Sequence, residues 1–262
     1  MMAPRGRVLI VAGSDSGGGA GIQGDIKTVS ALGGYAMTAI TALTAQNTQG
    51  VFGIHPVPED FIAQQMRCCL EDIGADAIKT GMLHSAAVIG TVAAECRAPG
   101  VRGLPLVVDP VMVAKGGAPL LAQAALSALK SELIPLATVL TPNLPEAAWL
   151  LGHPVEETAL EAAACALLDL GAQAVLLKGG HGTREVLTDL LVTRDGLRLT
   201  LTAPRVATRH THGTGCSFAS AIAAGLAQRL TLEAAVRRAH AYVQAAIARA
   251  PGLGAGNGPL GH

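Results

Sequence analysis

The sequence predicts a layered α/β fold built on a mostly parallel sheet. Three short apolar runs show no polar alternation: Val8–Ala12, Leu106–Val108 and Ala174–Leu177. Strands that are apolar on both faces belong in a sheet covered on both sides, and such sheets are usually parallel. Ala- and Leu-rich segments with polar residues at helical spacing alternate with these runs, as crossover helices do. They are Glu59–Ile73, Ala86–Cys96, Ala122–Leu133, Ala159–Leu170, Ser217–Arg229 and Leu232–Ala248.

Further segments complete the order of elements. Thr138–Leu140 is expected to be another strand, which follows the third helical segment. Arg184–Thr193 and Leu197–Ala203 alternate in polarity around the turn Arg194-Asp195-Gly196, a pattern that predicts a hairpin. We expect this hairpin to form an antiparallel edge on the sheet. The glycine-rich tail Gly252–Gly261 is expected to be a frayed terminus.

Composition narrows the class of protein. Of the 262 residues, 50% are hydrophobic, which excludes a disordered chain, and 19 Lys and Arg balance 19 Asp and Glu. Zero net charge and a scarcity of aromatic residues argue against partners such as nucleic acid or a membrane surface. No apolar run is long enough for a spanning helix or a signal peptide. The five Cys residues form no CxxC pair, which indicates reduced thiols in a cytoplasmic protein. No linker divides the chain, so residues 1–262 are expected to be one domain.

The loop after the first strand is rich in glycine and runs from Gly13 to Asp25. Its segment Gly19–Gly24 matches GxGxxG, the pattern of dinucleotide-binding loops. We reject that interpretation, because the glycines begin too far from the strand for the tight turn. The acid expected about twenty residues later is also missing, since Glu59 is the first acid after Asp25. The loop is either an ordinary connection or, as we favour, one whose backbone approaches a polar ligand.

A second glycine-containing loop, Thr211–Cys216, precedes the predicted helix Ser217–Arg229. Small residues at a helix start gather free N–H groups, and the helix dipole adds positive potential there. Gly213, Thr214, Gly215 and Cys216 therefore have the form of an anion site. A thiol in the first turn of a helix is expected to have a lowered pKa. The alternative for Cys216 is a small packing residue.

Polar residues also follow the central strands. Asp109 comes after Leu106–Val108, and Lys178 comes after Ala174–Leu177. Asn143 and Glu146 have the spacing of a capping box at a helix start. That structural role and a role near a metal or phosphate explain these two residues about equally well. Carboxyl ends of parallel strands form the ligand-binding edge of α/β proteins. An anion site, acids and a lysine at that edge indicate phosphoryl transfer by an ATP-using enzyme, and the sequence has no P-loop motif.

Ordered motifs over almost the whole chain make the sequence similar to one enzyme family. It resembles the hydroxymethylpyrimidine/phosphomethylpyrimidine kinases of thiamine biosynthesis, in the ribokinase-like superfamily. The motifs are Ala12–Asp15 with Gly19–Asp25, Ala45–Thr48, Lys79–Leu83, Val108–Met112, Thr141–Ala147, Lys178–His181 and Thr211–Cys216. The resemblance implies a three-layer α/β/α fold. It also implies two ATP-dependent phosphorylations, of 4-amino-5-hydroxymethyl-2-methylpyrimidine and then of its monophosphate.

The resemblance assigns roles to residues by position in these motifs. Gly213, Thr214, Gly215 and Cys216 are the catalytic anion hole, and Cys216 could act as the base toward the alcohol. The cofactors would be ATP and Mg²⁺. The remaining assignments are Gly13, Asp25, Gln46, Met82 and Val111 for the pyrimidine, Asn143, Lys178 and Thr211 for the nucleotide, and Glu146 and Asp109 for magnesium.

Two other interpretations are open. A pyridoxal or pyridoxine kinase of the same superfamily shares the Gly-Cys anion hole, but Ala45–Thr48 is closer to the pyrimidine kinases. A non-catalytic pyrimidine or nucleotide sensor is less favoured, because no helix-turn-helix or basic arm is apparent. The family resemblance further implies a homodimer.

Overall fold

The structure is a computed structural model that describes residues 6–112, 124–180 and 185–262. Ala122, Gln123, His181 and Arg184, which belong to predicted segments, lie outside the described residues. Within the described ranges, one sheet has nine strands in the order β3-β2-β1-β4-β5-β6-β7-β8-β9. Neighbouring strands from β2 to β7 pair in parallel, whereas β3, β8 and β9 pair antiparallel. The predicted mostly parallel sheet with an antiparallel edge is therefore confirmed.

The elements follow one another in an alternating order. The strands are β1 Arg7–Asp15, β2 Tyr35–Asn47, β3 Gly50–Pro56, β4 Ala77–Thr80, β5 Leu106–Val108, β6 Val139–Leu140, β7 Ala174–Leu177, β8 Val186–Thr193 and β9 Arg198–Pro204. The helices are α1 Gly21–Ala31, α2 Glu59–Cys68, α3 Ala86–Arg97, α4 Ala125–Ala128, α5 Leu144–Leu151, α6 Leu160–Leu168, α7 Thr214–Ala227 and α8 Leu232–Ala248. Short π-helical turns at Cys69–Ile73 and Leu129–Leu133 extend α2 and α4, and a 3₁₀ turn follows at Ile134–Leu136.

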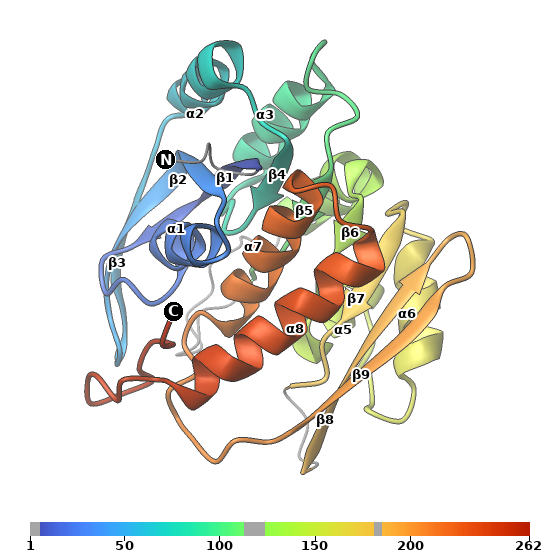
Figure 1. The fold of residues 1–262 in the computed structure, drawn as a ribbon. Coiled ribbons are helices and arrows are strands. Elements are labelled where there is room, and N and C mark those ends of the chain that lie inside the picture. Colours follow the sequence, from blue (N-terminus) through green and yellow to red (C-terminus); the bar gives the residue numbers. More distant parts are fainter. Residues whose placement is uncertain (1–5, 113–123, 181–184) are drawn as a thin grey trace.

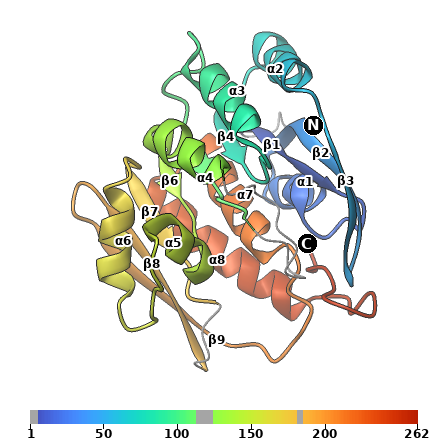
Figure 2. The ribbon, with the colours of Figure 1, turned by 180° about the vertical axis from the view of Figure 1, so that it is seen from behind.

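Helices cover both faces of the sheet, so the fold has three layers. Alternate residues of β1 enter different cores: Val8 and Ile10 pack under α1, α7 and α8, whereas Leu9 and Val11 pack under α2 to α6. Figure 1 shows the first helical layer in front of the sheet, and Figure 2 shows the second. This burial on both faces is why the central strands read as continuous apolar runs. Among the described residues, no helix is long and apolar enough to cross a membrane.

The predicted hairpin is present as β8 and β9, which pair from Val186 with Pro204 to Val192 with Arg198. Two boundaries differ in a way that matters for the site. The helix expected at Ser217 begins earlier, at Thr214, so Cys216 lies inside its first turn. The strand expected to end at Ala12 continues to Asp15.

The C-terminal tail is not frayed, which corrects the sequence-based expectation. The Asn257 N–H donates to the Thr48 carbonyl at 2.8 Å, and the Gly258 carbonyl accepts from the His212 N–H at 3.1 Å. Leu260 is 4% exposed and packs in the core under α8. Glycine content alone gave no sign of these long-range partners. The tail therefore joins the β2–β3 connection to the loop before α7.

Candidate active site

The strand ends bring the predicted site residues to one edge of the sheet. Because β1, β2, β4, β5, β6 and β7 are parallel, the loops that follow them meet there. Gln46 lies at the end of β2, and Met82 follows β4. Asp109 follows β5, Asn143 follows β6, and Lys178 follows β7.

An ion pair links two of these strand ends. Lys178 Nζ lies 3.1 Å from Asp109 Oδ1, and both side chains are largely buried. Burial opposes the charge on Lys178, but Asp109 and Glu146 raise its pKa above the ordinary value. Burial also raises the pKa of Glu146 to about 7, against the attraction of Lys178. The predicted capping box is present, because Asn143 Oδ1 accepts from the Glu146 N–H and Glu146 Oε2 accepts from the Asn143 N–H, both at 2.9 Å.

The first turn of α7 faces this ion pair. Gly213 has φ of +87°, and Thr214 Oγ1 donates to the Thr211 carbonyl at 2.7 Å. A β-carbon at Gly213 would overlap the carbonyl oxygen of Gly19, so the loop after β1 is in direct contact with this turn. A β-carbon at Gly215 would lie 3.2 Å from Lys178 Nζ. The positive end of the α7 dipole and the ammonium group of Lys178 therefore converge, as an anion site requires.

Replacing Gly213 by alanine is expected to reduce phosphoryl transfer by roughly 10²-fold, because displaced donors no longer match the transferring group. The strained φ and the overlap with Gly19 would both push the start of α7 away from its position. Steady-state ATP turnover measures this loss. Gly152→Ala is the matched control, since Gly152 also has positive φ (+81°) but has nothing within 4 Å of a β-carbon. Equal losses in both variants would show that backbone strain, and not the anion site, is responsible.

The pKa predicted for Cys216 is wrong. The half-buried thiol lies in the first turn of α7, near Lys79, Asp25 and Asp109. Burial raises its pKa to about 12; Lys79 opposes this rise, and the two carboxylates add to it. The helix position alone favoured a thiolate, but desolvation outweighs the helix dipole here. Cys216 is therefore a protonated thiol at neutral pH.

Asp25 also differs from its expected role. Its side chain is fully buried, with Oδ2 2.8 Å from Lys79 Nζ and Oδ1 accepting from Ser220 Oγ at 2.6 Å. Both oxygens are occupied by protein groups, so Asp25 does not reach a pyrimidine in this structure. Lys79, which was predicted only as part of the Lys79–Leu83 motif and given no role, is equally buried and lies near enough to Cys216 for their charges to interact. A lysine directly after the apolar residues Ala77 and Ile78 of β4 was the available signal.

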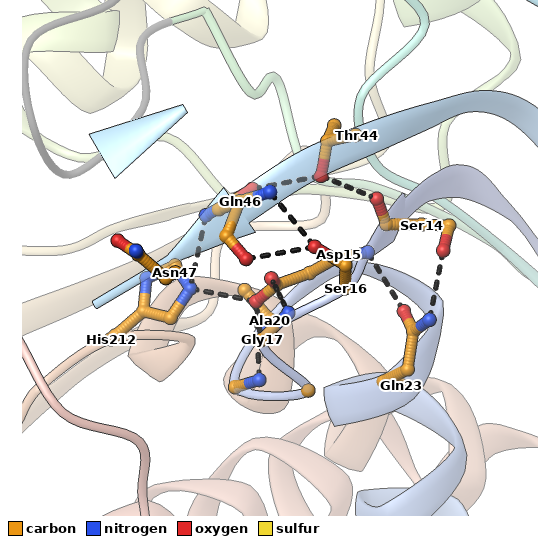
Figure 3. A network of polar contacts seen from close by, with 12 residues as sticks. Ser14, Asp15, Ser16, Gly17, Ala20, Gln23, Thr44, Gln46, Asn47 and His212 are labelled. Atoms are coloured by element: carbon orange, nitrogen blue, oxygen red, sulfur yellow. Dashed lines mark hydrogen bonds and ion pairs between the residues drawn. The ribbon is translucent and has the colours of Figure 1, made fainter. Parts of the chain in front are cut away.

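Of the other residues expected around the pyrimidine, Gly13 and Met82 are in contact. A β-carbon at Gly13 would lie 3.0 Å from Met82 Sδ, so the thioether rests against the glycine backbone. The Val111 N–H donates to the Asp109 carbonyl at 2.8 Å, which connects the apolar residue to the charged part of the site. Gln46 lies across from His212 and Thr44, with a contact of 3.2 Å to each (Figure 3).

A family model described as "Phosphomethylpyrimidine kinase" matches residues 15–261. The chain belongs to the phosphomethylpyrimidine kinase family. It is 46% identical to the hydroxymethylpyrimidine/phosphomethylpyrimidine kinase of Haemophilus influenzae, over 98% of this chain and 96% of that protein. It is 52% identical to the thiamine biosynthesis bifunctional protein ThiED of Geobacter sulfurreducens, over 99% of this chain. The chain spans only about half of that longer protein, 52% of its length.

The similar solved structures include a pyridoxal kinase and a phosphomethylpyrimidine kinase. An ADP complex of Bacillus subtilis pyridoxal kinase has a TM-score of 0.90 at 36% identity and covers 98% of this chain and 97% of its own. The phosphomethylpyrimidine kinase of Clostridium difficile has a TM-score of 0.79 at 38% identity, covering 91% of this chain and 97% of its own. The ribokinase-like, three-layer fold implied by the resemblance is therefore confirmed.

Proposed function

We propose that this chain transfers the terminal phosphoryl group of ATP to the hydroxyl of 4-amino-5-hydroxymethyl-2-methylpyrimidine, and then to the phosphate of the resulting monophosphate. The observation that carries this proposal is the first turn of α7, which meets the Lys178–Asp109 ion pair at the ligand-binding edge. Phosphoryl transfer needs positioned donors and cations more than covalent help from the protein. Family membership supplies the substrate class.

The proposal divides the site into two parts. Gly13, Gln46, Met82 and Val111 surround the pyrimidine, while Asn143, Lys178 and Thr211 lie on the side of the nucleotide. The N–H groups of Gly213 to Cys216 stabilise the transferring phosphoryl group. One domain, residues 1–262, carries both parts.

Asp109 and Glu146 would hold a Mg²⁺ that arrives with the nucleotide and offsets the charge of its phosphates. Across residues 6–112, 124–180 and 185–262, no three His, Cys, Asp or Glu side chains gather as a metal site. This arrangement fits a magnesium that takes one or two carboxylates from the protein and the rest of its ligands from phosphate and water.

Removing divalent metal with EDTA is expected to abolish turnover, and added Mg²⁺ is expected to restore it. Metal analysis of the purified protein is expected to find no stoichiometric zinc, because the donors at the site are oxygens rather than thiolates or imidazoles. Turnover that persists in EDTA would contradict the assignment of Asp109 and Glu146.

A coupled ATP-consumption assay tests the proposed function. The substrates are the hydroxymethylpyrimidine, its monophosphate and pyridoxal, measured side by side. We expect turnover with both pyrimidines. Preferred turnover of pyridoxal would favour the alternative, pyridoxal kinase activity, which the similar solved structures make the second candidate. Absence of product with all three would favour a sensor.

Gln46→Leu is expected to weaken productive binding of the hydroxymethylpyrimidine by about 1–3 kcal/mol, because polar groups of the ligand lose their partner. Nucleotide binding should change little, since Gln46 lies at the end of β2 and Lys178 follows β7, with four strands between them in the sheet. Titration calorimetry with each ligand separates the two effects. Unchanged affinity for the pyrimidine would place the pyrimidine elsewhere.

We also propose a homodimer in the cytoplasm. On β3, the edge strand of the sheet, Phe52 is 72% exposed and Ile54 is 42% exposed. Exposed apolar side chains on an edge strand can serve as a protein interface. The five cysteines are all unpaired, as expected in a reducing compartment. Sedimentation of the wild type and of Phe52→Asp tests the dimer.

A further inference from the structure

The C-terminal tail contacts the candidate active site at two places that the proposed function does not use. At the first, it fits around Thr48, which lies two residues after Gln46. The Gly256 N–H donates to Thr48 Oγ1 at 3.2 Å, and the Asn257 N–H donates to the Thr48 carbonyl at 2.8 Å. A β-carbon at Gly254 or at Gly256 would overlap Thr48, so the tail backbone is in close contact with this residue.

The second place is the segment just before the first turn of α7. The His212 N–H donates to the Gly258 carbonyl at 3.1 Å, and His212 directly precedes Gly213. The next tail residue, Pro259, lies against the glycine-rich loop, because a β-carbon at Gly19 would be 3.1 Å from Pro259 Cβ. Gly19 in turn contacts Gly213 through its carbonyl oxygen. Two consecutive residues of the tail therefore contact both neighbours of Gly213.

The end of the tail is anchored in the core. Leu260 is 4% exposed and packs under α8. The Gly261 N–H donates to the Ala246 carbonyl of that helix at 3.0 Å. In Figure 1 the tail, drawn in red, loops out past the end of α8 and returns toward α1. The segment that contacts Thr48 and His212 is therefore held between α8 at one end and the core at the other.

These contacts belong to different parts of the proposed site. Gln46 lies on the side of the pyrimidine, and Gly213 lies where the transferring phosphoryl group binds. The glycine-rich loop is a first bridge between them, because Ser16 Oγ donates to the Gln46 carbonyl at 2.8 Å and Gly19 contacts Gly213. The tail is a second bridge and also supports the first. We infer, on the basis of the proposed function, that residues 254–260 are positioning residues that fix the separation between the pyrimidine hydroxyl and the phosphoryl group.

Phosphoryl transfer is sensitive to this separation. A misplacement of about 1 Å between reacting groups can slow a reaction about 10²-fold, even when it arises away from the chemistry. The residues that bind each substrate are not part of the tail. A displaced tail should therefore lower kcat and leave the affinity for each substrate nearly unchanged.

Gly256→Ala tests this inference, since its β-carbon would overlap the Thr48 carbonyl and displace the tail. We expect kcat per nucleotide-binding site to fall about 10²-fold with both pyrimidine substrates. Calorimetry supplies the number of sites, which counts folded protein, and the affinity for each ligand alone, which should change little. Gly50→Ala is the control, because a β-carbon at this first residue of β3 has nothing within 4 Å. An unchanged kcat per site in Gly256→Ala would overturn the inference. If that variant does not fold, Asn257→Pro, which removes the N–H bonded to Thr48, should give the same result.

A second measurement needs no substrate. The His212 N–H is bonded to the tail, so its hydrogen exchange should become about tenfold faster or more in Gly256→Ala, relative to the amides of β1. It should stay unchanged in Gly50→Ala. Exchange at His212 that remains as slow as in the wild type would show that the two contacts of the tail are independent, which would overturn the inference. This readout separates failure of the inference from failure of the proposed function.

Discussion

The rate of alcohol phosphorylation is expected to rise about tenfold per pH unit between roughly pH 7 and 9, with no plateau in that range. Cys216, the base expected for the alcohol, must lose its proton before it can accept one. Burial raises the pKa of its thiol to about 12. The thiolate fraction therefore grows with pH throughout the range. The monophosphate is already anionic above about pH 6 and needs no base, so its rate should stay nearly flat. Initial rates with the two substrates across pH measure both slopes.

Cys216→Ala is expected to remove this slope and to slow the alcohol reaction by roughly 10²–10⁴-fold, the usual range for loss of a general base. The backbone donors of Gly213 to Cys216 survive the substitution, so phosphorylation of the monophosphate should fall much less. Cys165→Ala is the control, as a half-buried thiol on α6, away from the strand ends. Equal losses on both substrates would leave Cys216 as a packing or anion-hole residue. A plateau near pH 7 would mean that bound ligands lower the thiol pKa.

Lys79→Met is expected to destabilise the fold by about 3–5 kcal/mol, the range for breaking a buried ion pair. Lys79 and Asp25 are both fully buried and lie 2.8 Å apart, so the substitution leaves an uncompensated carboxylate inside the protein. Burial lowers and Asp25 raises the pKa of Lys79, and the net result is an increase, which keeps the ammonium charged. Denaturant unfolding measures the loss.

A double variant, Asp25→Leu with Lys79→Met, separates the cost of an unpaired charge from the value of the pair. It should be more stable than Lys79→Met alone, because no buried charge remains. Arg237→Met is the surface control, since Arg237 pairs with Glu233 one turn away in a largely exposed position. Its effect should stay within about 0.5 kcal/mol. A loss in Lys79→Met no larger than this would mean that Asp25 is neutral in the fold.

Much of the fold could be predicted because the central strands are buried on both faces. β5 and β7 were located to the residue by their apolar runs, and the hairpin of β8 and β9 by its alternation. β2 was missed because Thr and Ala residues dilute its pattern and much of the strand is only half-buried. α1 was hidden in the glycine-rich loop, where low helix propensity is outweighed by packing against β1 and α7.

The sequence predicted where most of the site residues lie, but not the protonation state of Cys216 or the ion pair of Asp25. The ion pair of Asp109 with Lys178 joins the ends of β5 and β7, which are parallel strands separated only by β6. The pKa of Cys216 and the partners of Asp25 do not, because both depend on Lys79, a residue more than fifty positions from Asp25. Desolvation is a property of the assembled core, and a sequence pattern carries no measure of it.

The contact between Asp25 and Ser220 also constrains the order in which the protein can mature. These residues are separated by 195 positions, and the tail partner of His212, Gly258, comes later still. A ribosome delivers residues from the N-terminus at about 5–20 per second. The first strands and their glycine-rich loop must therefore wait about 10–40 seconds, with Asp25 lacking its Ser220 partner, until α7 emerges. Half-synthesised chains expose that incomplete edge, so chaperone binding should be strongest before residue 220 has left the ribosome and should end with release of the tail.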